Sequence, residues 1–347
     1  MPKREDAVLR VVGTDPGTSS LDLLLLVDGK VSDQARLVPG QLQASPAALC
    51  RLLERWAPLD LIVGPSGYGL PLIQGNDLRE EHLDLMVLVR PDERGGELGV
   101  PGFRSWVRAM VASKQPVVIL PGLIHLPTVP AHRKVNTIDL GTPDKLCVAA
   151  LALRVDADER GGSCAEATFA VVEIGSAFSA VLVMARGSLV DAAAGTRGPI
   201  GLRSGGAWDG EAAYWRSPLS KADLFRGGHD DLPEPLRESF REALVKHVAG
   251  IRAVTPFDRL YLSGAGLDRP EIRSLSMSAL AQFGETRLLP TLRGATVKHA
   301  AQGAALLADG LAGGRNADLV ESLRLREARG SVLDWLFPVS PATGLTS

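Results

Sequence analysis

The stretch VGTDPGT, residues 12–18, is followed by an apolar run at residues 21–27 and then by the pair Asp28-Gly29. The same order returns 158 positions later, where AVVEIGS, residues 170–176, precedes an apolar run and the pair Arg186-Gly187. Each copy is typical of a strand, a turn with an acid and a glycine, a second strand and a tight glycine turn into a third. We therefore predict two homologous halves, each of which opens with a β-meander.

Beyond each meander the sequence alternates between short apolar strands and amphipathic helices. Such alternation favours an α/β fold whose parallel or mixed sheets are covered on both faces. A polar, glycine-rich segment at 156–165 is expected to join the halves, which predicts two domains, residues 1–155 and 156–347. The expected elements are helices at 46–56, 143–154, 235–251, 269–283 and 297–311, and strands at 59–63, 115–120, 260–262 and 287–289.

The composition is that of an ordinary globular protein, with 45% hydrophobic and 22% charged residues in a chain of 347. Lysine and arginine number 38 against 40 acidic residues, a balance that argues against a general nucleic-acid-binding protein. The first ten residues are polar and the apolar run that follows is too short to cross a bilayer, so we expect neither a signal peptide nor a membrane partner. Three cysteines without CxxC spacing indicate a reduced, cytoplasmic protein.

The first turn carries residues that suit a phosphate group. Glycine lets the backbone approach a phosphate, and successive N–H groups and small hydroxyl side chains can surround it. Asp15 is placed to hold Mg²⁺, which keeps much of its water shell and needs few carboxylates. A plain hairpin turn is the alternative interpretation, because Asp, Pro and Gly are common in turns. The candidate nucleotide-binding residues of this turn are Gly13, Thr14, Gly17, Thr18 and Ser19.

Three later segments add candidates for the same site. The second turn, residues 173–176, supplies a second acid, and SGAG at 263–266 follows a predicted strand, where a base or ribose can pack on bare backbone. The helix predicted at 297–311 has a face of small residues that allows close approach. The alternative interpretations are a plain turn for residues 173–176, a helix cap for 263–266 and close packing against a neighbouring element for the helix at 297–311. The candidates are Glu173, Gly175, Ser176, Gly264, Ala265, Gly266 and Gln302.

These motifs resemble those of the superfamily that contains acetate and sugar kinases, heat-shock chaperone ATPases and actin. Residues 15–18 match its first phosphate motif, 173–176 stand in the place of its second, and 263–266 resemble its adenosine motif. The resemblance covers most of residues 7–313. It implies two duplicated ribonuclease-H-like domains, an actin-like ATPase fold, with ATP in a central nucleotide cleft and Mg²⁺ held by Asp15 and Glu173.

Two segments narrow the resemblance. NTIDLGTPDK, residues 136–145, and GAWDGE, residues 206–211, are similar to an uncharacterised family called predicted butyrate kinases. One departure concerns the second phosphate motif, which usually reads Asp-x-Gly-Gly in the superfamily. Here Glu173 reaches about one methylene further, and Ser176 lacks the conformational freedom of glycine.

The segment GTPDK, residues 141–145, resembles the Gly-x-Asp-Arg segment of type III pantothenate kinases and the Gly-Asp-Gln segment of glycerol-type kinases. The resemblance implies that Asp144 is the base for an acceptor hydroxyl. The alternative is a helix start, with Thr142 as N-cap, proline at the first position and an acid in the first turn. Loops and solvated charge runs are the alternatives for the other acceptor candidates. These are Ser66, Gly67, Tyr68, Arg133, Lys134 and Asp209.

We therefore expect an ATP-dependent phosphotransferase for a small-molecule acceptor with a hydroxyl or carboxylate group. Phosphoryl transfer needs mainly positioning and charge neutralisation from the protein. An acid at position 144 favours a hydroxyl, because an alcohol must lose its proton whereas a carboxylate is already ionised at neutral pH. The alternatives are a nucleotide-binding ATPase switch and a degenerate member with no acceptor. A homodimer is left open beside a monomer.

Overall fold

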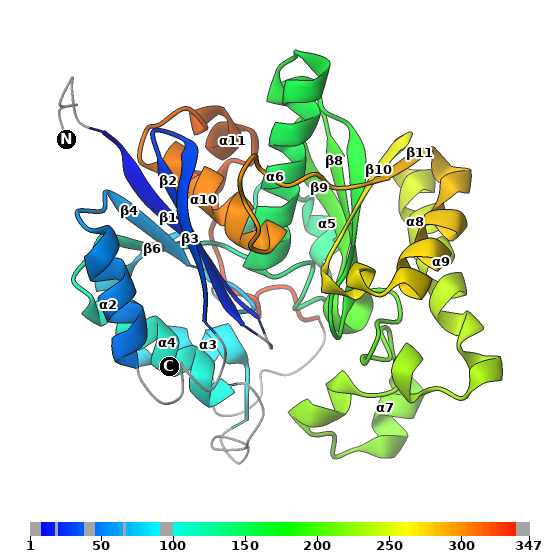
Figure 1. Ribbon diagram of the computed structural model, residues 1–347. Helices are drawn as coiled ribbons and strands as arrows, with labels where there is room; N and C mark the ends of the chain where they lie inside the picture. The colour runs from blue at the N-terminus through cyan, green and yellow to red at the C-terminus, as the bar shows by residue number, and fades with distance from the viewer. Residues whose placement is uncertain (1–7, 18–19, 38–45, 65–66, 91–99, 338–347) are drawn as a thin grey trace.

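The computed structural model describes residues 8–17, 20–37, 46–64, 67–90 and 100–337. Two β-sheets stand side by side, and helices lie between them and on their outer faces (Figure 1). The strands are β1 Arg10–Pro16, β2 Leu21–Val27, β3 Lys30–Leu37, β4 Leu61–Gly64, β5 Ile73–Gln74, β6 Val117–Ile119, β7 Phe169–Ile174, β8 Ser179–Ala185, β9 Ser188–Ala193, β10 Arg259–Ser263 and β11 Glu285–Leu288. The helices are α2 Pro46–Trp56, α3 Glu80–Val87, α4 Val100–Ala112, α5 Ala131–Lys134, α6 Pro143–Arg160, α7 Gly210–Arg216, α8 Glu238–Val254, α9 Pro270–Leu280, α10 His299–Leu311 and α11 Ala317–Ser322.

The two sheets share one strand order. The first runs β3-β2-β1-β4-β6-β5, and the second, read from its other edge, runs β9-β8-β7-β10-β11. In each sheet the meander is antiparallel, and the next strands, β4 and β6 or β10 and β11, join in parallel. The predicted mixed α/β fold with two opening meanders is confirmed.

The meanders also match in detail. The second turn has φ values of 49° and 72° at Asp28 and Gly29, and of 48° and 71° at the corresponding Arg186 and Gly187. Two successive positive φ values are typical of the type I′ turns that suit the twist of a hairpin. The register shift between Leu25 and Leu26 also recurs 158 positions later, between Val183 and Met184. The repeat seen in the sequence therefore extends to the backbone geometry.

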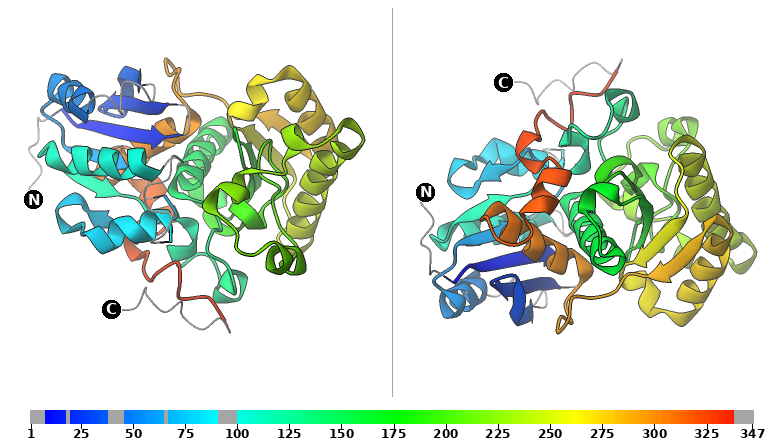
Figure 2. Two further views of the ribbon diagram at one scale, coloured as in Figure 1. Left: turned by 90° about the horizontal axis from the view of Figure 1, so that it is seen from below. Right: turned by 90° about the horizontal axis from the view of Figure 1, so that it is seen from above.

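Helices α6 and α10 lie between the sheets and pack against each other (Figure 2). Helix α10 covers the inner face of the first sheet at β1, β2 and β4, and α6 covers β7 and β8 of the second. The backbones approach closely: a Cβ atom on Gly13 would lie 2.0 Å from the backbone nitrogen of Ala305, and one on Gly303 would lie 1.8 Å from the carbonyl oxygen of Cys147. Only glycine fits at these two positions. The outer faces are covered by α2, α3 and α4 on one side and by α8 and α9 on the other.

This arrangement corrects the predicted domain boundary. The boundary at 155/156 falls inside α6, because residues 156–160, predicted as part of a linker, form the last turns of this helix. Moreover, α6 comes from the first half of the chain but packs on the second sheet, whereas α10 comes from the second half and packs on the first. The polar residues at 156–160 resemble a linker in sequence, but their charges are paired in the structure.

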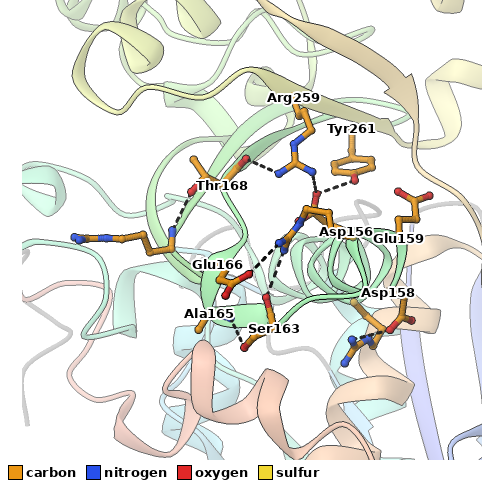
Figure 3. Close-up of polar contacts among 12 residues, drawn as sticks. Asp156, Asp158, Glu159, Ser163, Ala165, Glu166, Thr168, Arg259 and Tyr261 are labelled. Atoms are coloured by element: carbon orange, nitrogen blue, oxygen red, sulfur yellow. Dashed lines mark hydrogen bonds and ion pairs between the residues drawn. The ribbon is translucent and has the colours of Figure 1, made fainter.

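Asp156 is the centre of this pairing (Figure 3). Its carboxylate is fully buried and accepts hydrogen bonds from Arg160 Nε at 2.8 Å, from Tyr261 Oη at 3.1 Å and from Arg259. Tyr261 and Arg259 belong to β10, so the carboxylate joins the last turn of α6 to the second sheet. Both oxygens of this buried carboxylate are thus hydrogen-bonded, and two guanidinium groups balance its charge.

We expect Asp156→Ala to lower the free energy of unfolding by about 1–3 kcal/mol, because the buried Tyr261 hydroxyl loses its acceptor and the partly exposed Arg160 and Arg259 lose their buried counter-charge. Asp158→Ala is the matched control: its side chain is 65% exposed and pairs with Arg154 along the helix at 2.7 Å. Such a pair contributes about 0.5 kcal/mol. Urea denaturation of both variants measures the difference, and equal losses would contradict a structural role for the Asp156 network.

Candidate active site

A cavity of about 1150 Å³ lies between the two halves and is lined by both. Asp15 stands at the end of β1, and Glu173 stands at the matching position of β7. Asp144 and Lys145 come from the first turn of α6, which lies between the sheets. All four side chains line the cavity. The structure therefore brings together three of the four acids that the sequence singled out.

Two lysines lie among these acids. Lys145 Nζ is 2.6 Å from Asp144 Oδ2 and 3.2 Å from Glu173 Oε2. Lys298, which directly precedes α10, has its Nζ 3.6 Å from Asp15 Oδ2 and 3.8 Å from Asp22 Oδ1. Sequence reasoning assigned no role to either lysine. The available indications were only that one follows Asp144 and the other precedes the small-residue helix.

The surroundings of the acids separate their pKa values. Burial raises the pKa of Asp15 to about 7, against the opposing charge of Lys298. Burial likewise raises the pKa of Glu173, although Lys145 opposes it. For Asp144, burial is outweighed by the charge of Lys145 and by hydrogen bonds from Lys145 and Thr142, which hold its pKa below the ordinary value. Asp144 is therefore ionised at neutral pH, and Asp15 is close to half protonated.

Asp144 is also held on both of its oxygens. Thr142 Oγ1 donates to Oδ1, and Lys145 donates to Oδ2 at 2.6 Å. Thr142 precedes the helix as predicted, but its side chain binds Asp144 and makes no hydrogen bond to the helix backbone. This geometry suits a fixed negative charge better than a proton acceptor, and the role of base that the resemblance implies for Asp144 stays a prediction.

Several small residues of the predicted nucleotide site line the cavity as well. They are Gly17, Gly175, Ser176, Gly264 and Ala265. Gly17 and Gly175 lie at matching turns. Gly17 N donates to Ser20 O at 2.8 Å, and Gly175 N donates to Phe178 O at 2.9 Å. Gly264 has a φ of 107° and rests on the end of β7, where a Cβ atom would lie 2.2 Å from the carbonyl oxygen of Ile174.

Four other predicted nucleotide-binding residues lie outside the cavity, where packing accounts for them. Gly13 is the contact point with α10, and Thr14 Oγ1 donates to the carbonyl oxygen of Val63 at 3.0 Å. Gly266 is buried against Ile174. Gln302 is fully buried, accepting from Leu292 N and donating to Val297 O, both at 2.7 Å. The predicted residues Thr18 and Ser19 lie outside the described residues.

Some of the predicted acceptor-binding residues also line the cavity, and others lie away from it. Gly67 and Tyr68 line the cavity. Arg133 instead donates to Val190 O at 2.8 Å and lies 3.4 Å from Asp191, and the buried Lys134 donates to Leu126 O at 2.8 Å. Asp209 caps α7, where it accepts from Glu211 N at 2.9 Å, so these three have structural partners away from the cavity. Ser66 lies outside the described residues.

The cavity contains a further acid and a third lysine that the sequence did not single out. Asp139 lies in the segment before α6, and Lys221 comes from the second half. Lys221 Nζ donates to Tyr68 Oη at 2.6 Å and lies 4.2 Å from the centre of the tyrosine ring. This contact joins the two halves across the cavity.

A magnesium ion at this site would be held by few protein carboxylates. In the part of the chain that the structure describes, no three His, Cys, Asp or Glu side chains converge as they would around a metal ion. Mg²⁺ accepts one or two carboxylates when waters and phosphate oxygens complete its shell. Asp15 offers such a carboxylate, whereas Glu173, the other predicted ligand, is paired with Lys145.

None of the described helices is long and apolar enough to cross a membrane.

The chain belongs to the family described as "Protein of unknown function (DUF1464)", which matches residues 13–337. No curated protein matches the sequence. Among solved structures it is similar to a propionate kinase from Francisella tularensis subsp. tularensis SCHU S4, with 13% identity and a TM-score of 0.57 over 85% of this chain and 98% of that one. It is also similar to the acetate kinase of Entamoeba histolytica, with 12% identity and a TM-score of 0.53 over 79% and 86% of the two chains. The chain thus shares its fold with these kinases.

The charge of Asp139 can be tested through stability. Burial raises its pKa to about 6 in the folded state, above the ordinary 3.8, so the folded protein binds more protons than the unfolded chain between these values. The carboxylate therefore lowers the free energy of unfolding as the pH rises through this range. We expect Asp139→Asn to be more stable than the parent at pH 8 and to lose this advantage toward pH 4, at no more than about 1.4 kcal/mol per pH unit. Urea denaturation at several pH values measures the effect.

Asp144→Asn is the matched control and has the opposite sign. The pKa of Asp144 is lowered on folding, so its charge stabilises the protein above the pKa of the unfolded chain. Its removal should cost stability at pH 8. Equal effects of the two variants at pH 8 would show that their surroundings do not differ as described.

Proposed function

We propose that this protein is an ATP-dependent phosphotransferase that acts on a small-molecule acceptor. The observation that carries the proposal is the convergence of Asp15, Glu173, Asp144 and Lys145 on one cavity between two matching meanders. Phosphoryl transfer depends on positioned phosphates and neutralised charge. The fold shared with acetate and propionate kinases supports the same reaction class.

The matching strand orders and turns support a duplicated ribonuclease-H-like, actin-like ATPase fold. In this proposal the turns at 16–17 and 175–176 face the phosphates, and residues 264–265 face the adenosine. Asp15 holds Mg²⁺ through waters, and the metal supplies positive charge beside the phosphates. Lys145, Lys298 and the ionised Asp144 fix the charge around the reacting group. The three free cysteines support a reduced, cytoplasmic setting.

The size of the cavity favours a kinase over a nucleotide-binding switch. It extends past the acids to Tyr68, Lys221 and Trp208 and is not filled by side chains there. A nucleotide-only switch needs no such space. Small-molecule sites are commonly 300–1,000 Å³ in volume, so about 1150 Å³ can hold two ligands side by side.

Nucleotide binding gives the first test. We expect Mg·ATP to raise the melting temperature of the parent, because a ligand that binds only the folded state adds about 2.7 kcal/mol at 100 times its Kd. Asp15→Asn should lose most of this shift. Asp209→Asn, whose side chain caps α7 away from the cavity, should keep it. An unchanged melting temperature of the folded parent at millimolar Mg·ATP would refute nucleotide binding.

Turnover gives the second test. ATP consumption is measured with a panel of polyols, pantothenate-like alcohols and short carboxylates. The panel includes butyrate, after which the family that segments 136–145 and 206–211 resemble is named. We expect at least one compound to raise ADP release above the rate with water alone, and Asp15→Asn to remove the increase. If ATP binds but no acceptor raises the rate, the ATPase switch becomes the better interpretation.

A further inference from the structure

Asp139 is held by a rigid loop that directs it into the cavity. Its Oδ1 accepts a hydrogen bond from Gly141 N at 2.7 Å. The neighbouring Leu140 is buried in the core, and the carbonyl oxygen of Gly141 accepts from Leu123 N at 3.0 Å. Core packing and backbone hydrogen bonds on both sides therefore fix the position of this carboxylate before any ligand binds.

The second oxygen of Asp139, Oδ2, differs from those of Asp144. Among the described residues no donor forms a hydrogen bond with it, whereas both oxygens of Asp144 are bound. The carboxylate occupies the space that a side chain at Gly195 would fill, since a Cβ atom there would lie 2.3 Å from Oδ2. The second half of the chain thus leaves room for Asp139 and its one unbound oxygen.

Charged and titratable groups face Asp139 from three sides. Asp144 and Lys145 approach from α6, Lys221 approaches from the second half, and Tyr68 approaches from the first. Burial is the main cause that raises the pKa of Asp139, and the charge of Asp144 adds to it, while the Gly141 N–H, Lys145 and Lys221 oppose it. Asp139 therefore lies within electrostatic reach both of Asp144 and Lys145 and of the Tyr68–Lys221 contact, and all of these residues line the cavity.

We propose that Asp139 is the residue that accepts the proton of a hydroxyl acceptor during phosphoryl transfer, in place of Asp144. The inference rests on the proposed phosphotransferase function. In the step, the acceptor O–H bond breaks and its proton moves to Asp139 Oδ2. The hydroxyl oxygen forms a bond to the γ-phosphorus of ATP, and the bond from that phosphorus to the bridging oxygen breaks, so that ADP leaves with the electron pair.

This assignment also selects the acceptor class. A general base needs a free oxygen within reach of the proton and a pKa near the working pH. A carboxylate acceptor needs no base and would be repelled by both Asp139 and Asp144. The acceptor is therefore an alcohol, with Tyr68 and Lys221 at the far end of its pocket.

The experiment compares Asp139→Asn with Asp144→Asn and the parent. An asparagine at 139 keeps the size of the side chain and an oxygen that accepts from Gly141 N. ATP consumption is measured from pH 5 to pH 8.5 at saturating Mg²⁺, with water and with glycerol as acceptors. We expect the parent rate to rise with pH through about 6 and then level off. Asp139→Asn should be slower by about 10²–10⁴-fold and lose this rise, with an unchanged thermal shift by Mg·ATP.

Three controls make the result decisive. Asp144→Asn should keep the rise near pH 6 whatever its maximal rate, and Asp209→Asn should behave like the parent. Asp139→Glu, which keeps a carboxylate, should keep the rise at a reduced rate, and it serves if Asp139→Asn does not fold.

A rise that persists in Asp139→Asn, or that disappears in Asp144→Asn instead, overturns the assignment while the phosphotransferase function stands. A parent that binds Mg·ATP but consumes it with neither water, glycerol nor any other compound of the acceptor panel overturns the proposed function and this assignment with it.

Discussion

The close approach of α10 to β1 and to α6 is the constraint on which the rest of the molecule depends. Because Gly13 and Gly303 have no side chains, one helix can touch a strand of the first sheet and the helix of the second. The same contact brings the start of α10 to the cavity, where the backbone N–H of Lys298 donates to Asp22 Oδ2 at 3.0 Å and His299 Nδ1 lies 2.8 Å from Ser263 Oγ. Packing at the centre of the fold thus sets the geometry of the candidate site.

Local sequence pattern identified many of the helices and strands but not the elements that they pack against. The helix predicted at 46–56 coincides with α2, and the repeated acid–glycine turns identified both meanders, because periodicity and turn chemistry act over a few residues. The linker at 156–165 was wrong in its first five residues, since Asp156 is polar in sequence but buried against β10 in the fold. The packing of α10 on α6 and on β1, β2 and β4 joins segments more than 100 residues apart, which no local pattern contains.

Sequence motifs likewise identified some residues of the candidate site and missed others. Asp15, Asp144 and Glu173 were identifiable because each stands in a motif of acids and small residues, and they do meet in one cavity. Not all of the predicted nucleotide-binding residues line the cavity, since Gly13 contacts α10 and the buried Gln302 binds backbone groups. The lysines escaped notice because an ion pair such as Lys145–Glu173 joins a helix of one half to a strand of the other.

The balance of charge in the cavity bears on what it can bind. The acids at its centre already hold the nearest ammonium groups, with Lys145 between Asp144 and Glu173 and Lys298 beside Asp15. A bare polyphosphate would therefore meet carboxylates whose counter-charges are in use, and like charges in a partly buried site repel strongly. A polyphosphate that carries its own divalent cation removes this conflict, because the cation can lie between the phosphates and Asp15 and favours the ionised form of that acid. This balance of charge supports the proposal that the site takes a metal–nucleotide complex and not a free anion.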